Sequence, residues 1–408
     1  MGTFLTEGAQ TPALFCVEKR KLHRYNKNWE ILRKNAKIRI DIQKNMRHTL
    51  QFYKSMLFYI LYYSFKFLKE AVILSKLYIP ENYSCPLTRN EVQHAIEQIK
   101  LSFQQYLGAA LNLIRVSAPL FVPEDSGLND DLSGVERAVS FDIPDINTQA
   151  QVVHSLAKWK RTALHAYGFS KDEGLFTDMN AIRRDEVLDN IHSVYVDQWD
   201  WEKIISREER NLEYLKNVVE RIVSAICLAH KAVKLLFPAI KVELCEKVTF
   251  ITAQELEDLY PALTPEEREY EFTKAHKTVF IMQIGDTLAS GIRHGSRAPD
   301  YDDWALNGDL LCWSDVLGNV IELSSMGIRV DSASLQAQLK KADCNHRLKY
   351  KYHQQIVNDE LPLTIGGGIG QSRLCMLMLG CAHIGEVQSS IWDRETRKIC
   401  KENGIFLL

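Results

Sequence analysis

The sequence predicts an α+β fold in which a largely antiparallel β-sheet is flanked by helices. Helical patterns occur at 88–107, at 208–237, where the pattern is amphipathic, and at 371–379, which reads as a buried helix. Segments with strand character occupy much of the remainder, at 192–202, 279–284, 309–313 and 320–324. Long stretches of strand with helices at the two ends are typical of an α+β domain.

The composition is that of an ordinary globular protein with a sizeable core. Of the 408 residues, 46% are hydrophobic and 25% are charged. The formal net charge of -2 gives no whole-chain argument for binding nucleic acid or an anionic membrane. The 9 cysteines are scattered, without a C-x-x-C pair or a His/Cys cluster at zinc spacing. We therefore expect reduced thiols and a cytoplasmic location.

Residues 1–85 differ in composition from the rest of the chain. A basic stretch runs over about 18–54, and an aromatic and aliphatic run follows at Met56–Phe65. That run is shorter than the roughly 20 residues that a membrane helix needs. Three interpretations stay open: a basic arm for nucleic acid or an acidic partner, a poorly ordered extension, or translated non-coding sequence. We place a domain boundary at Pro86, so that 86–408 form the second domain.

The first elements of this domain follow from local signals. Thr88 or Asn90 can cap the first helix, and Gly108 lies near its end. The strand pattern of 113–122 is interrupted by Pro119, which has no N–H for a ladder, so an edge, a bend or a contact to another subunit is expected. The segments 138–143 and 151–154 predict a hairpin, and a helix begins within 155–161.

Polar side chains lie on one face of the strand predicted over 192–202. Alternation places Gln198 and Asp200 on that face and Trp199 and Trp201 on the opposite one. If Gln198 and Asp200 only faced solvent, the two tryptophans would carry the packing alone. We therefore favour a binding surface over a solvated face.

The run Leu361–Leu374 predicts a nucleotide site. Gly366, Gly367, Gly368 and Gly370 are interpreted as a turn that permits positive φ and lets a flat ligand lie against bare backbone. Arg373 follows in the first helical turn, where it can pair with a phosphate or stack on a base. The spacing excludes a Walker A loop and a dinucleotide fingerprint. The alternative is a junction that needs its glycines only for packing.

Charged groups elsewhere are those that an ATP-using site needs. Carboxylates occur at Asp300, Asp302, Asp303 and Glu322, and cations at Lys160, Arg183 and Arg329. Carboxylates can hold Mg²⁺, and the cations can neutralise a triphosphate. The alternatives are an exposed acidic loop for 300–303 and a structural ion pair of Glu322 with Arg329.

Five segments, in order, resemble the ammonia-dependent asparagine synthetases, also called aspartate–ammonia ligases. These segments are 153–161, 192–202, 297–304, 322–331 and 364–374. The resemblance runs from about residue 86 to the C-terminus and implies a catalytic core like that of class II aminoacyl-tRNA synthetases, in a homodimer with no role for a membrane. It further implies that aspartate attacks the α-phosphorus of ATP to give β-aspartyl-AMP and pyrophosphate, with Mg²⁺ present. Ammonia then displaces AMP to give asparagine.

The resemblance also implies roles for individual residues. The nucleotide side would consist of Arg183 on the α-phosphate, Arg373 with Gly368 and Gly370 around the adenine and phosphates, and Asp302 and Glu322 as the carboxylates for Mg²⁺ and nucleotide. The aspartate side would consist of Asp200 and Ser325 on the amino end, Lys160 and Arg329 on carboxylates, and Gln198 on the reacting acyl group. Asp130 would orient or deprotonate ammonium, with its neighbour Asp131 as the alternative.

Two features depart from the family pattern. Residues 1–85 have no counterpart, and the chain is short between Asp303 and Asn307, where a lid over the nucleotide would be trimmed. Two other functions stay open. One is a tRNA synthetase-like enzyme that uses the basic arm for tRNA, although the chain lacks a recognisable anticodon-binding domain. The other is a non-catalytic paralogue that binds a nucleotide or an amino acid.

Overall fold

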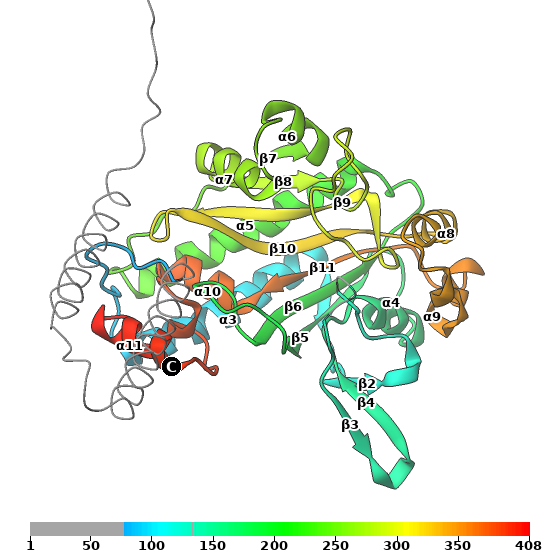
Figure 1. Cartoon of the computed structure of the whole chain (residues 1–408), viewed down its shortest axis with the longest axis horizontal. Helices are drawn as coiled ribbons and strands as arrows, with labels where there is room; N and C mark the ends of the chain where they lie inside the picture. The colour runs from blue at the N-terminus through cyan, green and yellow to red at the C-terminus, as the bar shows by residue number, and fades with distance from the viewer. Residues whose placement is uncertain (1–76, 133, 135) are drawn as a thin grey trace, which may run out of the picture. The chain divides into compact units, whose positions relative to one another are not determined.

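An eight-stranded sheet organises the residues that the computed structural model describes, which are 77–132, 134 and 136–408 (Figure 1). The predicted basic stretch and the aromatic run lie outside these residues. The strands are ordered β1-β5-β6-β11-β10-β9-β8-β7. Their bounds in that order are Leu113–Arg115, Gly174–Ile182, Tyr195–Ile204, Thr364–Gly370, Asn319–Arg329, Asp302–Ser314, Thr278–Met282 and Thr249–Thr252. Only the outer pairs β1–β5 and β7–β8 are parallel within this sheet, so the predicted, largely antiparallel α+β arrangement is confirmed.

One face of the sheet carries a layer of three helices, α3 (Arg89–Leu111), α5 (Leu212–Leu236) and α10 (Gln371–Leu379). Helix α3 begins with the predicted cap, because Thr88 and Glu91 form a reciprocal capping box. The tryptophans of β6 are fully buried in the core on this side, and the ring of Trp199 packs 4.7 Å from that of Phe103. The prediction that Trp199 and Trp201 share a face is therefore confirmed, and the other face of β6 is left for a site.

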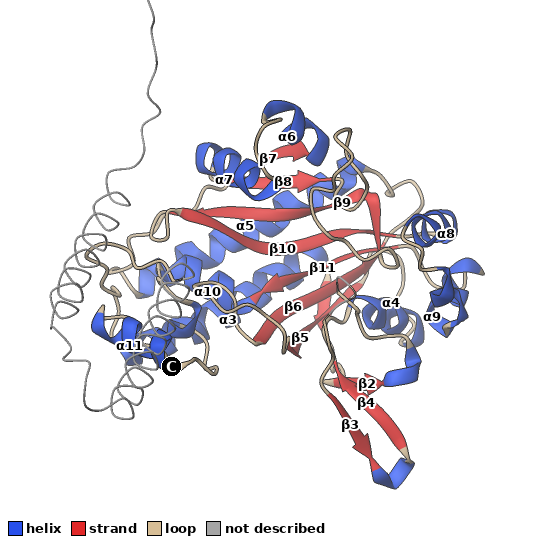
Figure 2. Cartoon of the chain, viewed as in Figure 1, coloured by secondary structure: helices blue, strands red, loops and turns tan. Residues whose placement is uncertain are grey.

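On that other face, α4 (Ala157–Ala166) packs over β6 and β11. The remaining helices are α6 (Ala253–Leu259), α7 (Pro265–His276), α8 (Ser332–Lys341), α9 (Lys351–Val357) and α11 (Arg394–Glu402). A small second sheet of β2 (Phe121–Pro123), β4 (Thr148–Val152) and β3 (Ser140–Ile143) projects from the main sheet (Figure 2). Its β3–β4 hairpin is the predicted one. Pro119 lies in the connection between β1 and β2, which belong to different sheets, so the single strand pattern of 113–122 is divided there.

The glycine run does not form the predicted turn. Gly366 to Gly370 lie in strand β11, none with positive φ, and the helix begins after them at Gln371. A Cβ on Gly366 would lie 1.9 Å from Glu202 Oε2, and one on Gly368 would lie 2.5 Å from Gln198 Oε1. The glycines are therefore needed because functional side chains of β6 and β10 cross close to this backbone, and not because the chain reverses.

Residues 77–85 lie on the extension side of the boundary predicted at Pro86. In the structure the backbone N–H of Tyr78 donates to Asn190 Oδ1 at 2.8 Å, and the hydroxyl of Tyr83 donates to Glu386 Oε2 at 2.9 Å. The compact unit that includes them is Glu70–Leu408. In the part of the chain described, no helix combines the length and apolar character needed to cross a membrane. Strand β9 runs without interruption through Asp303–Asn307, where a shortened lid was predicted.

Candidate active site

A cavity of about 340 Å³ lies on the open face of the sheet, over β6, β10 and β11. All the site residues that the sequence predicted line it, namely Asp130, Lys160, Arg183, Gln198, Asp200, Asp302, Glu322, Ser325, Arg329, Gly368, Gly370 and Arg373. A second cavity of about 340 Å³ shares Arg183, Glu322 and Ser325 with the first, so the two adjoin. A long polar cleft of this kind can hold two substrates side by side.

One end of the cleft is built around Lys160 and Asp200. Lys160 Nζ donates to the carbonyl of Gly367 at 2.8 Å and lies 3.2 Å from Asp200 Oδ2. Burial lowers the pKa of Lys160, while the Asp200 carboxylate opposes that shift. The other oxygen, Asp200 Oδ1, is buried without a hydrogen-bond partner in the described residues. A buried, unsatisfied carboxylate oxygen is suited to an ammonium group of a ligand.

A buried ion network underlies the same end. Arg329 pairs with Glu202 Oε2 at 2.7 Å and also with Asp302 Oδ1, and all three side chains are buried. Thr364 Oγ1 donates to Glu202 Oε1 at 2.7 Å. Burial would lower the pKa of Arg329, but Glu202 and Asp302 raise it well above its usual range. This network holds the guanidinium plane rigidly against the cavity wall.

Two alternatives raised from the sequence are wrong. Glu322 does not pair with Arg329; its carboxylate lies 3.7 Å from Arg373 Nη1 instead. The segment 300–303 is not an exposed acidic loop, because Asp300, Asp302 and Asp303 are all buried and paired with cations.

The other end of the cleft carries a carboxylate pair that includes Asp309, which the sequence argument missed. The Ser325 hydroxyl lies 2.6 Å from Asp309 Oδ1 and 2.9 Å from Glu322 Oε1, so one hydroxyl joins the two acids. Burial and the neighbouring Glu322 raise the pKa of Asp309 to about 6, against the opposing effect of Arg297. A hard divalent cation would relieve this crowding of negative charge.

No local signal marked Asp309, because the register of two strands places it in the site. It directly opposes Ser325 across β9 and β10. Asp302, predicted to share the metal with Glu322, is occupied by Arg329 and lies 3.7 Å from Arg297. Asp309 Oδ1 is itself paired with Arg297 Nη2 at 2.5 Å, but the shared Ser325 hydroxyl places it beside Glu322. Ser325, predicted on the amino end of aspartate, contacts this carboxylate pair.

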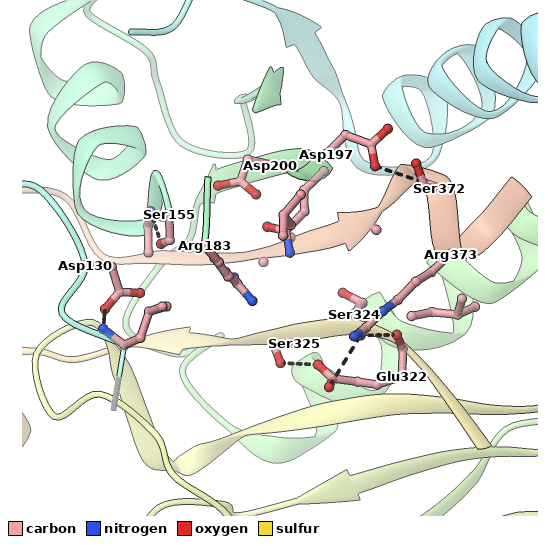
Figure 3. Close-up of a pocket in the computed structure, with 18 of the residues that line it drawn as sticks. Asp130, Ser155, Arg183, Asp197, Asp200, Glu322, Ser324, Ser325, Ser372 and Arg373 are labelled. Carbon is pink, nitrogen blue, oxygen red and sulfur yellow. Dashed lines mark hydrogen bonds and ion pairs between the residues drawn. The ribbon is translucent and has the colours of Figure 1, made fainter. Parts of the chain in front are cut away.

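Two arginines face the carboxylate end. Arg373 donates through Nη1 to the carbonyl of Glu322 at 2.9 Å from the start of α10. Arg183 follows directly after β5, and its Nε is buried without a partner in the described residues. Figure 3 shows Arg183 reaching into the cavity between Asp130 on one side and Glu322 with Arg373 on the other. Two guanidinium groups on one cleft are suited to a polyphosphate.

The adjacent acids Asp130 and Asp131 have different surroundings. Asp130 is 3% exposed, lines the cavity, and accepts a hydrogen bond from the Tyr301 hydroxyl at 3.1 Å. His154 Nδ1 lies 3.0 Å from the Asp130 carbonyl. The Asp131 side chain is 61% exposed and pairs with Arg347 at 2.8 Å. Of the two, Asp130 is therefore the one placed to meet a ligand.

Comparisons with known proteins identify the family of this chain. The family described as aspartate-ammonia ligase matches residues 90–404. The chain is 57% identical over 340 residues to the aspartate–ammonia ligase of Clostridium tetani, covering 83% of this chain and 100% of that protein. The enzyme of the same name from Levilactobacillus brevis is 55% identical over 333 residues, covering 81% of this chain and 99% of that protein. This chain belongs to the aspartate–ammonia ligase family.

Solved structures confirm the predicted fold class. The asparaginyl-tRNA synthetase of Entamoeba histolytica in complex with asparaginyl-adenylate superposes with a TM-score of 0.54 at 15% identity, covering 74% of this chain and 66% of that chain. The Pyrococcus horikoshii asparaginyl-tRNA synthetase complexed with asparaginyl-adenylate gives 0.54 at 13% identity, covering 74% and 68%. At these identities the likeness concerns the fold alone, which is that of the class II synthetases.

Proposed function

We propose that this member of the family uses ATP to join ammonia to the side-chain carboxylate of L-aspartate, giving L-asparagine, AMP and pyrophosphate through β-aspartyl-AMP. The observation that carries the proposal is the pairing, in one cleft, of an ammonium-accepting end at Asp200 with a cation-accepting and phosphate-accepting end at Asp309, Glu322 and Arg183. The two ends would hold an amino acid and a nucleotide with the amino acid side chain directed at the phosphates.

Aspartate would bind by charge complementarity. Its α-ammonium group would meet the unsatisfied Asp200 Oδ1, and its α-carboxylate would meet Lys160 and Arg329. Gln198 lies on the same strand as Asp200, further along towards the nucleotide end, where its amide would contact the side-chain carboxylate. Because Lys160, Asp200 and Arg329 are buried and held by ion pairs, this end of the site would bind aspartate without reorganisation of the protein.

The first chemical step is an in-line displacement at phosphorus. An oxygen of the aspartate side chain forms a bond to the α-phosphorus of ATP, and the bond to pyrophosphate breaks. Arg183 and Arg373 would neutralise the charge that develops on the phosphoryl oxygens. Mg²⁺ would be held by Glu322 together with Asp309 rather than Asp302, and it would supply further charge neutralisation on the phosphates.

The second step needs ammonia at the acyl carbon. Ammonium would be bound beside Asp130, whose carboxylate can accept the proton that makes nitrogen nucleophilic. The nitrogen then bonds to the acyl carbon, and AMP leaves. The Tyr301 hydroxyl would hold Asp130 in place for this step.

A homodimer remains part of the proposal. Large apolar side chains are exposed on and beside the small projecting sheet, among them Leu120, Phe121 and Phe141. The rings of Phe121 and Phe141 pack edge to face at 5.1 Å and leave a shared apolar surface. Such a surface is typical of an interface between subunits. Light scattering on the purified full chain tests this part, and a monomer at micromolar concentration would contradict it. The cytoplasmic location stays a prediction.

The activity is tested with the full chain, aspartate, ATP, Mg²⁺ and ammonium. Asparagine, AMP and pyrophosphate should form in equal amounts and only when ammonium is present. Replacing ammonium with hydroxylamine should give β-aspartyl hydroxamate, because the same acyl carbon is trapped by another nitrogen nucleophile. Formation of ADP in place of AMP, or turnover that does not depend on ammonium, would refute the proposal.

A further inference from the structure

Two cysteine thiols and one carboxylate, all able to ligate a metal ion, meet at a second place in the domain. Cys85 precedes α3, Cys381 follows α10, and Glu386 ends the short helix η4 (Ile384–Glu386). The two Sγ atoms and a carboxylate oxygen of Glu386 all lie within 4.8 Å of one another. None of the three lines the active-site cavity. Cys381 and Glu386 are buried and Cys85 is half-buried, so the cluster is enclosed but reachable.

The Glu386 carboxylate has neutral hydrogen-bond donors only. Its Oε1 accepts from the backbone N–H groups of Ala382 and His383 at 2.8 and 3.0 Å, and the Tyr83 hydroxyl donates to Oε2 at 2.9 Å. Within 77–132 and 136–408 no lysine or arginine pairs with it. A buried carboxylate beside two thiols and without a cation is costly unless a positive charge enters.

The spacing suits one tetrahedral ion. Zn²⁺ binds cysteine sulfur at about 2.3 Å and carboxylate oxygen at about 2.0–2.2 Å, so donor atoms on one ion lie roughly 3.5–3.8 Å apart. Atoms already within 4.8 Å reach that separation by small side-chain rotations. Two thiolates and one carboxylate select a soft cation over Mg²⁺. The fourth position would be left for water or for the Tyr83 oxygen.

We propose that Cys85, Cys381 and Glu386 bind a thiophilic divalent cation of the Zn²⁺ class. The ion ties the segment before α3 to the loop after α10. That loop also forms the cavity wall, because the N–H of Ile384 donates to the Asn190 carbonyl at 2.7 Å and Ile384 lines the cavity. The Asn190 amide in turn bonds the carbonyls of Tyr78 and Ala382 at 2.8 and 2.7 Å. The ion therefore adds to the hydrogen bonds that already join the segment before α3 to the loop after α10.

The test uses the reduced, chelator-treated full chain with excess Mg²⁺, which occupies oxygen-ligand sites. Titration with Co²⁺ should give a sulfur-to-metal charge-transfer band that saturates at one ion per chain. Zn²⁺ should displace the Co²⁺ and raise the melting temperature. Cys85→Ser and Cys381→Ser should each lower the band per bound Co²⁺, because one thiolate remains, and should weaken Zn²⁺ binding by at least about 10–100-fold. The double variant Cys85→Ser/Cys381→Ser should lose the band. Glu386→Gln should weaken binding and keep a weaker band, since both thiolates remain.

Cys344→Ser is the matched control, because Cys344 is equally half-buried but lies outside the cluster. It should leave the band and the affinity unchanged. The proposal is overturned if the wild-type chain gives no thiolate band, or if the band survives in the double variant Cys85→Ser/Cys381→Ser. It is also overturned if an added small-molecule disulfide oxidises Cys85 and Cys381 to a disulfide bond while the reduced chain binds no Zn²⁺. None of these results depends on the ligase activity.

Discussion

Substitution Gly366→Ala tests the reason for the glycine-rich strand. Gly366 lies in β11 directly opposite Glu202 on β6 and Gly327 on β10. An added Cβ would lie 1.9 Å from Glu202 Oε2 and 2.7 Å from Arg329 Nη2. Both of these atoms belong to the buried ion pair that supports the aspartate end of the cleft. The methyl group must therefore displace the pair or the strand.

The size of the effect follows from burial. The side chains of Glu202 and Arg329 are 0% and 2% exposed, so neither can move its charge into water. Breaking a buried, hydrogen-bonded pair typically costs about 3–5 kcal/mol. With an unfolding entropy of about 2.1 cal/mol/K per residue, 1 kcal/mol shifts the melting temperature of a domain as long as 86–408 by about 1.5 °C. We expect Gly366→Ala to melt about 4–7 °C below the wild type.

The assay combines thermal unfolding with aspartate kinetics. Arg329 lines the cavity, so the KM for aspartate should rise together with the loss of stability. Gly295→Ala is the matched control, because its added Cβ meets only Ile284 Cγ2 at 3.6 Å. It should melt within about 1–2 °C of the wild type, since an unstrained Gly→Ala change alters stability by about 1 kcal/mol or less. A Gly366→Ala protein that melts like this control, with an unchanged KM for aspartate, would refute the close-approach explanation.

Three further outcomes are expected. Arg183→Ala should lower kcat by about 10²–10³-fold with an unchanged melting temperature, because its guanidinium stabilises developing charge; near-normal turnover would contradict the phosphate role. Asp130→Asn should raise the KM for ammonium strongly and Asp131→Asn only slightly, as measured by steady-state kinetics with varied ammonium. A larger increase in KM for Asp131→Asn than for Asp130→Asn would contradict the role of Asp130. Because the folded pKa of Asp309 is raised to about 6 from an unfolded value of about 3.9, its ionised form destabilises the fold. Melting curves in Mg²⁺-free buffer should therefore show the wild type losing stability relative to Asp309→Asn as the pH rises from about 4 to 6. Above pH 6 the difference in melting temperature should stay constant. A difference that does not change between pH 4 and 6 would disprove the raised pKa of Asp309.

Much of the site was accessible to prediction because its signals are local. Alternation along one strand was enough to separate Gln198 and Asp200 from the buried Trp199 and Trp201. The Thr88 cap of α3 likewise depends on residues within one helical turn. The family resemblance then assigned residues from several segments to a single site, and the structure brings all of them to one cavity.

Features that depend on which strands are neighbours escaped prediction. Asp309 joins the carboxylate end only because β9 and β10 pair in the register that sets it against Ser325. The glycines of β11 were assigned to a turn because their neighbours on β6 and β10 were unknown. Periodicity reports which face of an element a side chain occupies, but it carries no information about what the adjacent element places there.

The same distinction applies to the cysteines. Their spacing along the chain excluded a local zinc motif, and that conclusion holds for any run of neighbouring residues. Cys85 and Cys381 lie at opposite ends of the domain in sequence, and tertiary packing alone brings them to Glu386. Local sequence thus specified most of the elements, and the family resemblance supplied the roles expected of the cleft residues. Strand register and long-range packing decided which charges meet, because such contacts join residues that no local pattern connects.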